Sequence, residues 1–171
     1  MGQWNPAVGR ALAAVRAVTV LGGLRIVVTV DQLARYTDAP LSSLDIGLRN
    51  GPVAAGLLER LTQGTHIGYR HPDAAWTGLP SRIDAAPDAV EFARWYAGWL
   101  EECEPARREA AKLTAVTVAA AAAAAGDLAL AGRIRAGYAR TGRRARARQT
   151  AAAAGAGSGL GAGSEFAAPG H

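Results

Sequence analysis

Cysteine, lysine and aromatic residues are scarce in this chain of 171 residues, and each scarcity limits what the protein can be. The single cysteine, Cys103, excludes an intramolecular disulfide and a cysteine-rich zinc site, and is most simply a small core residue. Lys112 is the only lysine beside 18 arginines, which indicates a high-GC coding sequence and weakens arginine content as a functional signal. Aromatic residues make up 6% of the chain, so a few large rings must anchor the packing.

Long apolar runs are lacking as well. Residues 11–30 are interrupted by Arg16 and Arg25, and residues 113–125 are mostly alanine and shorter than the ~18–20 apolar residues that a membrane-spanning helix needs. The first residues lack the charged and apolar regions of a signal peptide, and Pro6 breaks the myristoylation pattern. We therefore expect a cytoplasmic protein without a membrane span.

Motifs of common enzyme classes are missing too. The chain has no Walker A loop, no G-x-S-x-G elbow and no H-E-x-x-H motif, and no pair of carboxylates stands out for acid–base chemistry. His66, His71 and Asp73 offer metal-ligand chemistry, but a spacing of five along a strand puts the two histidines on opposite faces. Surface or turn histidines are the favoured interpretation, so we predict no enzyme, no cofactor and no metal.

The net charge of +5 is unevenly distributed along the chain. Residues 1–127 hold twelve basic and thirteen acidic side chains, a net charge of −1, whereas residues 128–171 hold seven arginines and one acid, Glu165, a net charge of +6. The basic residues of this second part are Arg133, Arg135, Arg140, Arg143, Arg144, Arg146 and Arg148. Such a run either binds phosphates of a polyanion or merely keeps the chain in solution.

Hydrophobic spacing and turn residues predict the elements of the first half. Asn5 and Pro6 begin a helix over 6–20, a β-branched run predicts a strand over 24–30, and Asp31 caps a short helix that ends before Pro40. Residues 41–50 offer another short helix, residues 53–62 have helical spacing, and residues 65–70 alternate as a strand.

The second half is strongly helical. Pro87 favours the first position of a helix whose apolar stripe includes four rings: Phe92, Trp95, Tyr96 and Trp99. These rings either fill a core or leave surface for a protein interface. An alanine-rich helix follows over 106–125, Gly126 and Asp127 separate it from a last helix reaching about Arg140, and residues 141–171 have the composition of a disordered tail.

Residues 24–80 resemble a winged helix-turn-helix domain. In that family a first strand runs into a helix that often opens T-V-x-x-L-A, matched here by Thr29, Val30, Leu33 and Ala34. A recognition helix ending L-x-x-L-x-x-G follows, matched by Leu58, Leu61 and Gly64. A two-stranded wing comes next, which places residues 66–76 in the wing with Pro72-Asp73 at its tip. The family has a short turn where this chain has about a dozen residues after Ala39, so either a helix is inserted or the 53–62 helix is misassigned.

The resemblance implies duplex DNA as the partner. Base edges would be read from the recognition helix by Arg49, Arg60, Thr62 and Gln63. The wing would contact phosphates or the minor groove through His66, Arg70 and His71. The C-terminal arginines would add electrostatic attraction through Arg140, Arg143, Arg144, Arg146 and Arg148.

The sequence as a whole predicts a mainly α protein with a small β element: a winged-helix-like N-terminal part, long Ala-rich helices and a disordered tail. We divide it into residues 1–86, a helical extension over 87–140 that packs on the first part or forms an oligomer interface, and the tail over 141–171. Two functions are carried forward. One is a small DNA-associated accessory or regulatory protein of a high-GC bacterium, phage or plasmid. The other is a non-catalytic helical assembly module of a virion, scaffold or adaptor, for which a second copy of the chain is a candidate partner in a homo-oligomer.

Overall fold

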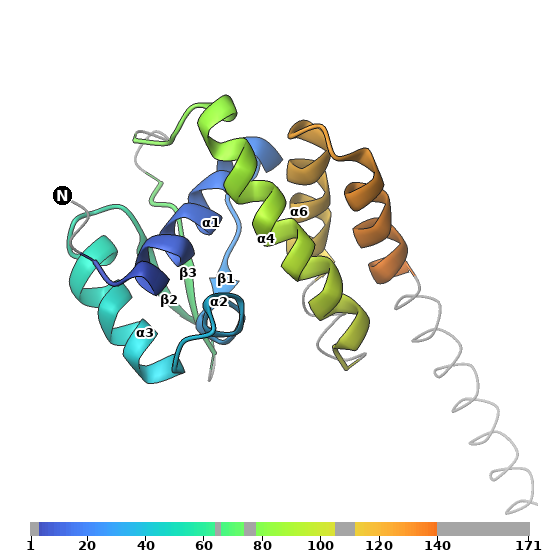
Figure 1. The fold of residues 1–171 in the computed structure, drawn as a ribbon. Coiled ribbons are helices and arrows are strands. Elements are labelled where there is room, and N and C mark those ends of the chain that lie inside the picture. The colour runs from blue at the N-terminus through green and yellow to red at the C-terminus, as the bar shows by residue number, and fades with distance from the viewer. Residues whose placement is uncertain (1–3, 64–65, 74–77, 105–111, 140–171) are drawn as a thin grey trace, which may run out of the picture.

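The computed structural model describes residues 4–63, 66–73, 78–104 and 112–139, and this part of the chain is mainly helical with a small sheet (Figure 1). The elements in chain order are α1 (Pro6–Gly22), β1 (Val28–Thr29), α2 (Val30–Thr37), α3 (Leu41–Leu48), the π-helix η1 (Arg49–Val53), β2 (Glu59–Gln63), β3 (His66–Arg70), α4 (Arg82–Glu102) and α6 (Lys112–Ala124). A further helix covers residues 128–139. The predicted fold class is confirmed. The predicted disordered tail, residues 141–171, lies outside the described residues.

The first helix follows from its end residues. The side chain of Asn5 accepts a hydrogen bond from the backbone N–H of Ala7 at 2.9 Å, and Pro6 occupies the first turn, where no helical N–H bond is lost. Gly23 ends α1 in a left-handed conformation (φ 71°), which glycine adopts without steric cost. The helix predicted over 6–20 is therefore confirmed.

The predicted strand over 24–30 is reduced to β1 because Thr29 acts as a helix cap. The Thr29 hydroxyl accepts a hydrogen bond from the Gln32 N–H, and the Gln32 side chain accepts one from the Thr29 N–H, each at 3.2 Å. This capping box starts α2 at Val30. Asp31, the predicted cap, instead lies in the first turn and pairs with Arg35.

The helix predicted over residues 53–62 is wrong. The short helix expected over 41–50 is present as α3, and it passes into η1, which contains Pro52. Gly56 then turns the chain with a φ of 76°, and residues 59–63 continue as strand β2. Proline withholds an N–H and a left-handed glycine breaks the helical path, so this segment cannot stay helical although its apolar residues have helical spacing.

The sheet has three antiparallel strands in the order β1-β3-β2 (Figure 1). Tyr69 of β3 pairs with Val28 on one side and with Arg60 on the other. The strand predicted over 65–70 is confirmed, but the predicted wing over 66–76 is wrong, because the hairpin is formed by β2 and β3. Gln63 pairs with His66, so β2 and β3 are joined between these two residues and not through Pro72-Asp73.

Helix α4 begins before the position predicted for it. Ser81 caps it by accepting a hydrogen bond from the Asp84 N–H at 3.1 Å, so Pro87 lies in the second turn instead of the first position. Phe92 and Tyr96 are fully buried, which corrects the prediction that they form a protein interface, while Trp95 and Trp99 are half-buried.

The core runs through the whole described part because α1 packs against α2, α3, α4 and α6. Alanines on α1 keep the helices close. Helices α1 and α6 approach closely at Gly22, where a β-carbon would lie 2.6 Å from Cγ2 and 2.8 Å from the carbonyl oxygen of Thr117 in α6. The helix bundle is therefore held by small side chains as much as by large ones.

The C-terminal helices follow the predicted pattern. Gly126 ends α6 with a φ of 94°, and the Asp127 carboxylate accepts a hydrogen bond from the Leu130 N–H at 3.0 Å, starting the helix over 128–139. Arg133 of this helix donates two hydrogen bonds to Glu101 of α4, at 2.8 and 2.9 Å. The cap predicted at Asp127 is confirmed.

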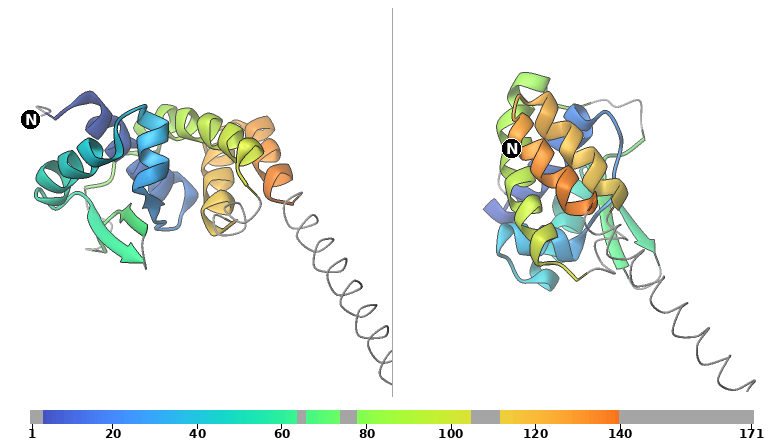
Figure 2. Two further views of the ribbon diagram at one scale, coloured as in Figure 1. Left: turned by 90° about the horizontal axis from the view of Figure 1, so that it is seen from below. Right: turned by 90° about the vertical axis from the view of Figure 1, so that its right-hand side faces the viewer.

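Figure 2 shows that α4 runs from the N-terminal part to α6 and the 128–139 helix, so α3 and the last helix lie at opposite ends of the molecule. The expected boundary between residues 86 and 87 falls inside α4. None of the helices in the described ranges is both long and apolar enough to span a bilayer.

Candidate nucleic-acid interface

The surface of α3 that faces solvent combines serine hydroxyls with aliphatic side chains. Ser42, Ser43 and Ile46 are exposed, and exposed Arg49 and Asn50 extend this surface into η1. Their spacing of three, four, seven and eight residues puts them on one side of the helix, opposite the buried residues that pack on the core. The side chains most able to touch a partner are thus gathered on a helix at one end of the molecule.

A glycine on the inner side lets α3 lie close to α1. A β-carbon at Gly47 would stand 2.6 Å from Cγ2 of Val8, a buried residue of α1. Leu44 and Leu48, on the same side as Gly47, are buried. The three residues fix the rotation of α3 about its axis, because turning the helix would bring its polar face into the core.

Asp45 joins α3 to the β2–β3 hairpin. Its carboxylate accepts hydrogen bonds from Nε and Nη2 of Arg60 on β2, at 3.2 and 3.1 Å, and from the hydroxyl of Tyr69 on β3. Arg49 lies 3.6 Å away on the same carboxylate. Tyr69 is fully buried, so its hydroxyl needs this partner.

The Asp45 carboxylate is held in its charged form. Burial raises the pKa of Asp45, but hydrogen bonds from Arg60 and Tyr69 outweigh it and leave the pKa below its ordinary value. Burial, and then the neighbouring carboxylate, raise the pKa of Tyr69. At neutral pH the group is therefore an Asp45 anion with a neutral tyrosine and two arginines.

Arg70 of the hairpin and Arg25, which precedes β1, are also paired. Nε of Arg70 donates to Glu59 at 2.8 Å. Nη1 of Arg25, from the segment before β1, lies 3.4 Å from Asp73 and 3.9 Å from Glu59. An open depression of about 660 Å³ over the outer side of the hairpin includes Glu59, Arg60, Arg70 and Asp73 among its lining residues. Positive and negative charges alternate there, so this face has little excess charge.

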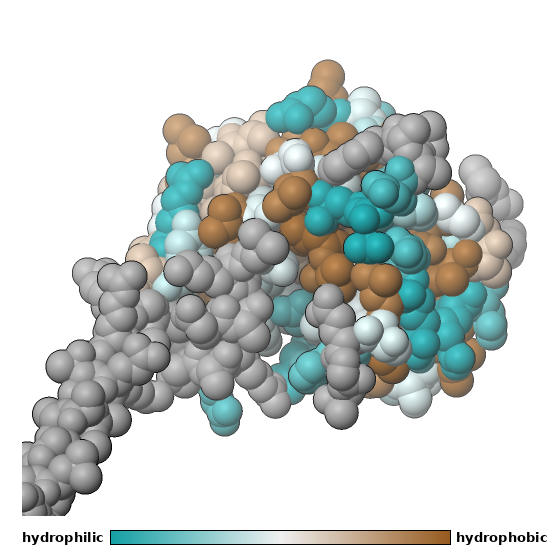
Figure 3. Space-filling model, turned by 180° about the vertical axis from the view of Figure 1, so that it is seen from behind, coloured by the Kyte–Doolittle hydropathy of each residue, from teal (hydrophilic) through white to brown (hydrophobic). Residues whose placement is uncertain are grey.

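Figure 3 shows the face that carries the sheet. Hydrophilic residues gather over the half that holds the sheet, and fewer are seen over the half that holds α6. On this face, the hydrophilic surface therefore belongs chiefly to the half that holds the sheet.

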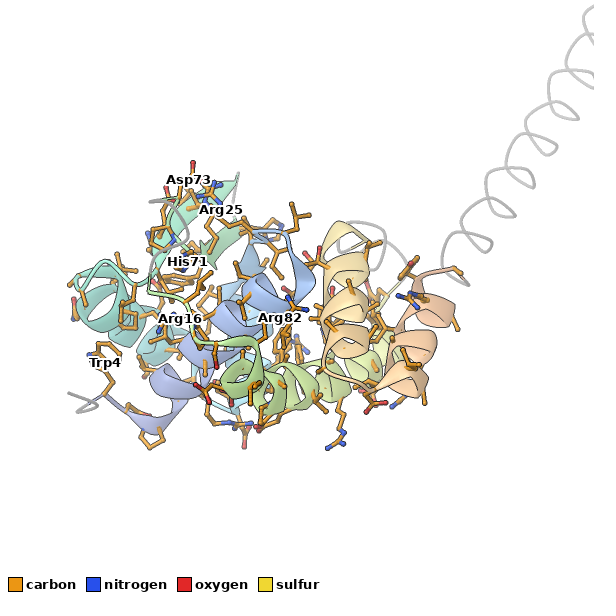
Figure 4. All side chains as sticks on the ribbon, turned by 90° about the horizontal axis from the view of Figure 1, so that it is seen from above. Trp4, Arg16, Arg25, His71, Asp73 and Arg82 are labelled. Atoms are coloured by element: carbon orange, nitrogen blue, oxygen red, sulfur yellow. The ribbon has the colours of Figure 1, made fainter. Side chains whose placement is uncertain are left out.

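A second group of cations surrounds His71, just after β3 (Figure 4). His71 is only 3% exposed, and its pKa is lowered by burial and then by Arg16 and Arg25. It is thus a neutral, buried residue, which corrects the prediction that it contacts phosphates. Arg16 of α1 is half-buried with a pKa lowered by burial, and it has no acidic partner among the described residues.

The structure brings most of the predicted DNA-binding residues of the body to one side. Arg49 ends up beside α3, and the hairpin carries Arg60, Thr62, Gln63, His66 and Arg70. Thr62 and His66 are exposed near the turn of the hairpin. Five more predicted residues lie outside the described part: Arg140, Arg143, Arg144, Arg146 and Arg148.

The polar residues of α3 itself were missed. Ser42 and Ser43 of α3, and Asn50 of the following η1, received no role because the recognition helix was expected after residue 53. The signal was present in the short link Asp38-Ala39-Pro40, since the resemblance implies a short turn between the two helices. Asp38 takes a left-handed conformation (φ 53°) there, which aspartate tolerates better than most residues.

Of the predicted interface rings, Trp95 and Trp99 keep some exposure. Their rings stack with centroids 6.1 Å apart and an interplanar angle of 22°. Phe92 and Tyr96 pack beneath them in the core.

In the described part of the chain, no three histidine, cysteine, aspartate or glutamate side chains come together in a way that could hold a metal ion. No family model matches the sequence, and neither the curated proteins nor the solved structures contain a match.

Proposed function

We propose that the segment from α1 to β3 docks on duplex DNA in the manner of a winged helix. Its elements follow one another as helix, strand, helix, helix, strand and strand. The winged-helix resemblance implies such a series: a strand, two helices joined by a short turn, and a two-stranded ribbon. The observation that carries the proposal is the exposed face of α3 beside a hairpin to which Asp45 fastens it.

In this arrangement α3 enters the major groove, which is about 12 Å wide and admits a helix. Ser42, Ser43 and Asn50 then face base edges with groups that both donate and accept hydrogen bonds. Thr62 and His66, near the turn of the hairpin, lie beside the sugar-phosphate backbone. The first residues of α3 add a positive helix end, which favours a phosphate.

Most of the affinity for DNA should come from the C-terminal part of the chain, where the excess of positive charge lies. The hairpin arginines Arg60 and Arg70 are paired with Asp45 and Glu59, and Arg25 before β1 is paired with Asp73, so they add little net attraction. A DNA-binding protein typically makes about 6–10 phosphate contacts, and these supply most of its non-specific affinity. The C-terminal arginines would supply them here, while α3 sets the position on the duplex.

The experiment is a fluorescence anisotropy titration of the full chain on a duplex of about three helical turns. Binding should be seen at about 50 mM salt and should weaken steeply towards about 200 mM. Ser42→Asp places a negative charge on the proposed reading face and should weaken binding at least about tenfold, because one opposed charge contact is worth more than 1 kcal/mol when water is excluded.

Ala129→Asp is the matched control. Residue 129, like residue 42, is exposed and is the second residue of its helix, so both variants change the net charge equally and tolerate an acid in the first turn. Duplex binding should fall for Ser42→Asp alone. Equal effects of both variants, or no binding of the full chain at low salt, would contradict the proposal.

The stacked, half-buried Trp95 and Trp99 favour a second candidate, a helical assembly module. In that case α4 forms a contact with another copy of the chain, and Trp99→Ala should lower the mass measured by light scattering at high concentration. A monomeric mass for the unaltered chain at every concentration would count against this candidate and leave the first unaffected.

A further inference from the structure

Two large aliphatic side chains of α3 face solvent. Leu41 is 44% exposed and Ile46 is 49% exposed. Leu41 begins the helix, and Ile46 lies one turn along it on the side of Ser42 and Ser43. A single exposed aliphatic residue is ordinary on a protein surface. These two, however, belong to the helix that the proposed function places against base edges.

The arginines nearest to this aliphatic pair are engaged by a carboxylate. Arg60 donates two hydrogen bonds to Asp45, and Nε of Arg49 lies 3.6 Å from the same group. Arginine is the side chain that most often reads guanine in the major groove, using two donors at once. Since Asp45 occupies two donors of Arg60 and is ion-paired with Arg49, this surface mainly offers the aliphatic carbons and hydroxyls of α3 and the amide of Asn50 in η1.

The first turn of α3 supplies charge complementarity beside the aliphatic pair. Pro40 precedes the helix, and its ring offers no side-chain hydrogen bond to the amides of the described first turn. Free amides at a helix start carry partial positive charge and bind phosphate. DNA therefore fits this surface better than an apolar protein face does, because a phosphate can meet the helix start while base edges meet Leu41 and Ile46.

Resting on the proposed function, we propose that Leu41 and Ile46 contact thymine methyl groups and that α3 therefore prefers A·T-rich duplex DNA. Among the four bases only thymine presents a methyl group in the major groove, and apolar side chains read it there. Asn50, four residues beyond Ile46 and on the same side of the helix, carries an amide of the kind that reads adenine through two hydrogen bonds. Adenine and thymine are thus the bases that this surface recognises.

Three duplexes of equal length test this: alternating adenine and thymine, the same duplex with uracil in place of thymine, and alternating guanine and cytosine. Uracil differs from thymine only by the missing methyl group, so charge and hydrogen bonding stay the same. Burying one such group is worth about 0.8 kcal/mol, or about fourfold in affinity. Contacts to one or two methyl groups predict that the full chain binds the uracil duplex about four to fifteen times more weakly.

Ile46→Ala should reduce the difference between thymine and uracil, because only Leu41 then remains to contact a methyl group, whereas Ile83→Ala should keep the full difference. Ile83 is 86% exposed at the start of α4, so Ile83→Ala makes the same chemical change at an exposed site away from α3. Circular dichroism of both variants verifies that the helices are retained.

The failures are distinguishable. Equal affinity for the thymine and uracil duplexes, or an unchanged difference in Ile46→Ala, overturns the methyl contact while DNA binding itself stands. No binding to any of the three duplexes contradicts the proposed function instead.

Discussion

At the scale of single residues, Asp45 connects the two elements of the candidate interface. It is buried, it belongs to α3, and its partners Arg60 and Tyr69 belong to the two strands of the hairpin. An amide at this position keeps the shape but removes the charge that the guanidinium needs. Because half-buried Arg60 then lacks its counter-charge, the substitution costs stability as well as position.

Asp45→Asn should lower the free energy of unfolding by about 1–3 kcal/mol at pH 7. The pKa of Asp45 is lowered in the folded protein, so its contribution is present above the ordinary aspartate pKa of about 3.9 and is lost as the pH falls below that value. Urea denaturation at several pH values should show the difference from the unaltered protein shrinking below about pH 4.

Asp31→Asn is the control for this series. Asp31 pairs with Arg35 one turn along α2, but both side chains are about half exposed, so the change should cost only a few tenths of a kcal/mol. A loss for Asp45→Asn that stays the same down to pH 3 would show that the carboxylate charge is not its cause.

Gly22 is the second residue with a specific spatial role. Gly22→Ala should destabilise the protein by about 1–3 kcal/mol, because the new methyl group would collide with the Thr117 backbone oxygen of α6 as well as its side chain. Gly9→Ala, in the same helix with open space around it, should instead stabilise by about 0.5–1 kcal/mol. Thermal unfolding of the pair measures both, and a loss at Gly9 equal to that at Gly22 would argue against the close contact.

At the scale of elements, the sequence predicted those whose ends carry a distinct chemical signal. Asn5 with Pro6 and Gly126 with Asp127 mark helix ends by side-chain capping and left-handed glycine, which depend only on neighbours in the chain. The helix prediction for residues 53–62 failed although the apolar residues have helical spacing, because Pro52 and left-handed Gly56 interrupt a helical path. Long-range contacts, chiefly the pairing of Arg60 with Tyr69, decided in favour of a strand.

The sequence predicted the residues of the candidate interface less well than it predicted the helices. Arg60 and Arg70 could be named because they are charged and lie near the hairpin. Their neutralisation by Asp45 and Glu59 could not be foreseen, since the partners are 15 and 11 residues away and meet only through the fold. The α3 surface was missed because its helix was placed one element too late.

The capping box of α2 gives a prediction at this scale. Thr29→Ala removes the hydroxyl that receives the Gln32 N–H and should cost about 1 kcal/mol of unfolding free energy. Thr62→Ala, an exposed threonine on β2, should cost a few tenths of a kcal/mol at most. Chemical denaturation compares the two, and an equal loss would mean that the strand preference of threonine, not capping, is responsible.

At the scale of the whole molecule, charge and folding are separated along the chain. Most of the described helices and the whole sheet lie within residues 1–127, which are nearly neutral, whereas the excess of arginine lies in residues 128–171, where the described helix over 128–139 holds Arg133 and Arg135. Affinity for a polyanion and stability of the fold should therefore respond to different deletions.

Deleting residues 141–171 should weaken duplex binding and leave the melting temperature nearly unchanged. The deletion removes four arginines, so the slope of log affinity against log salt should become less steep by up to about 3 to 4. Anisotropy titrations at several salt concentrations measure the slope, and calorimetry measures the melting temperature. An unchanged slope would show that these arginines do not touch DNA phosphates.

Helix α1 has a further consequence for the molecule as a unit. One side of it belongs to the packing around α2 and α3, and the other belongs to the packing around α4 and α6. Because both groups of helices pack against α1, neither group can unfold without exposing apolar surface of α1. The two ends of the protein should therefore unfold together, although their surfaces differ. Neither end should fold as an independent module when it is transferred to another chain.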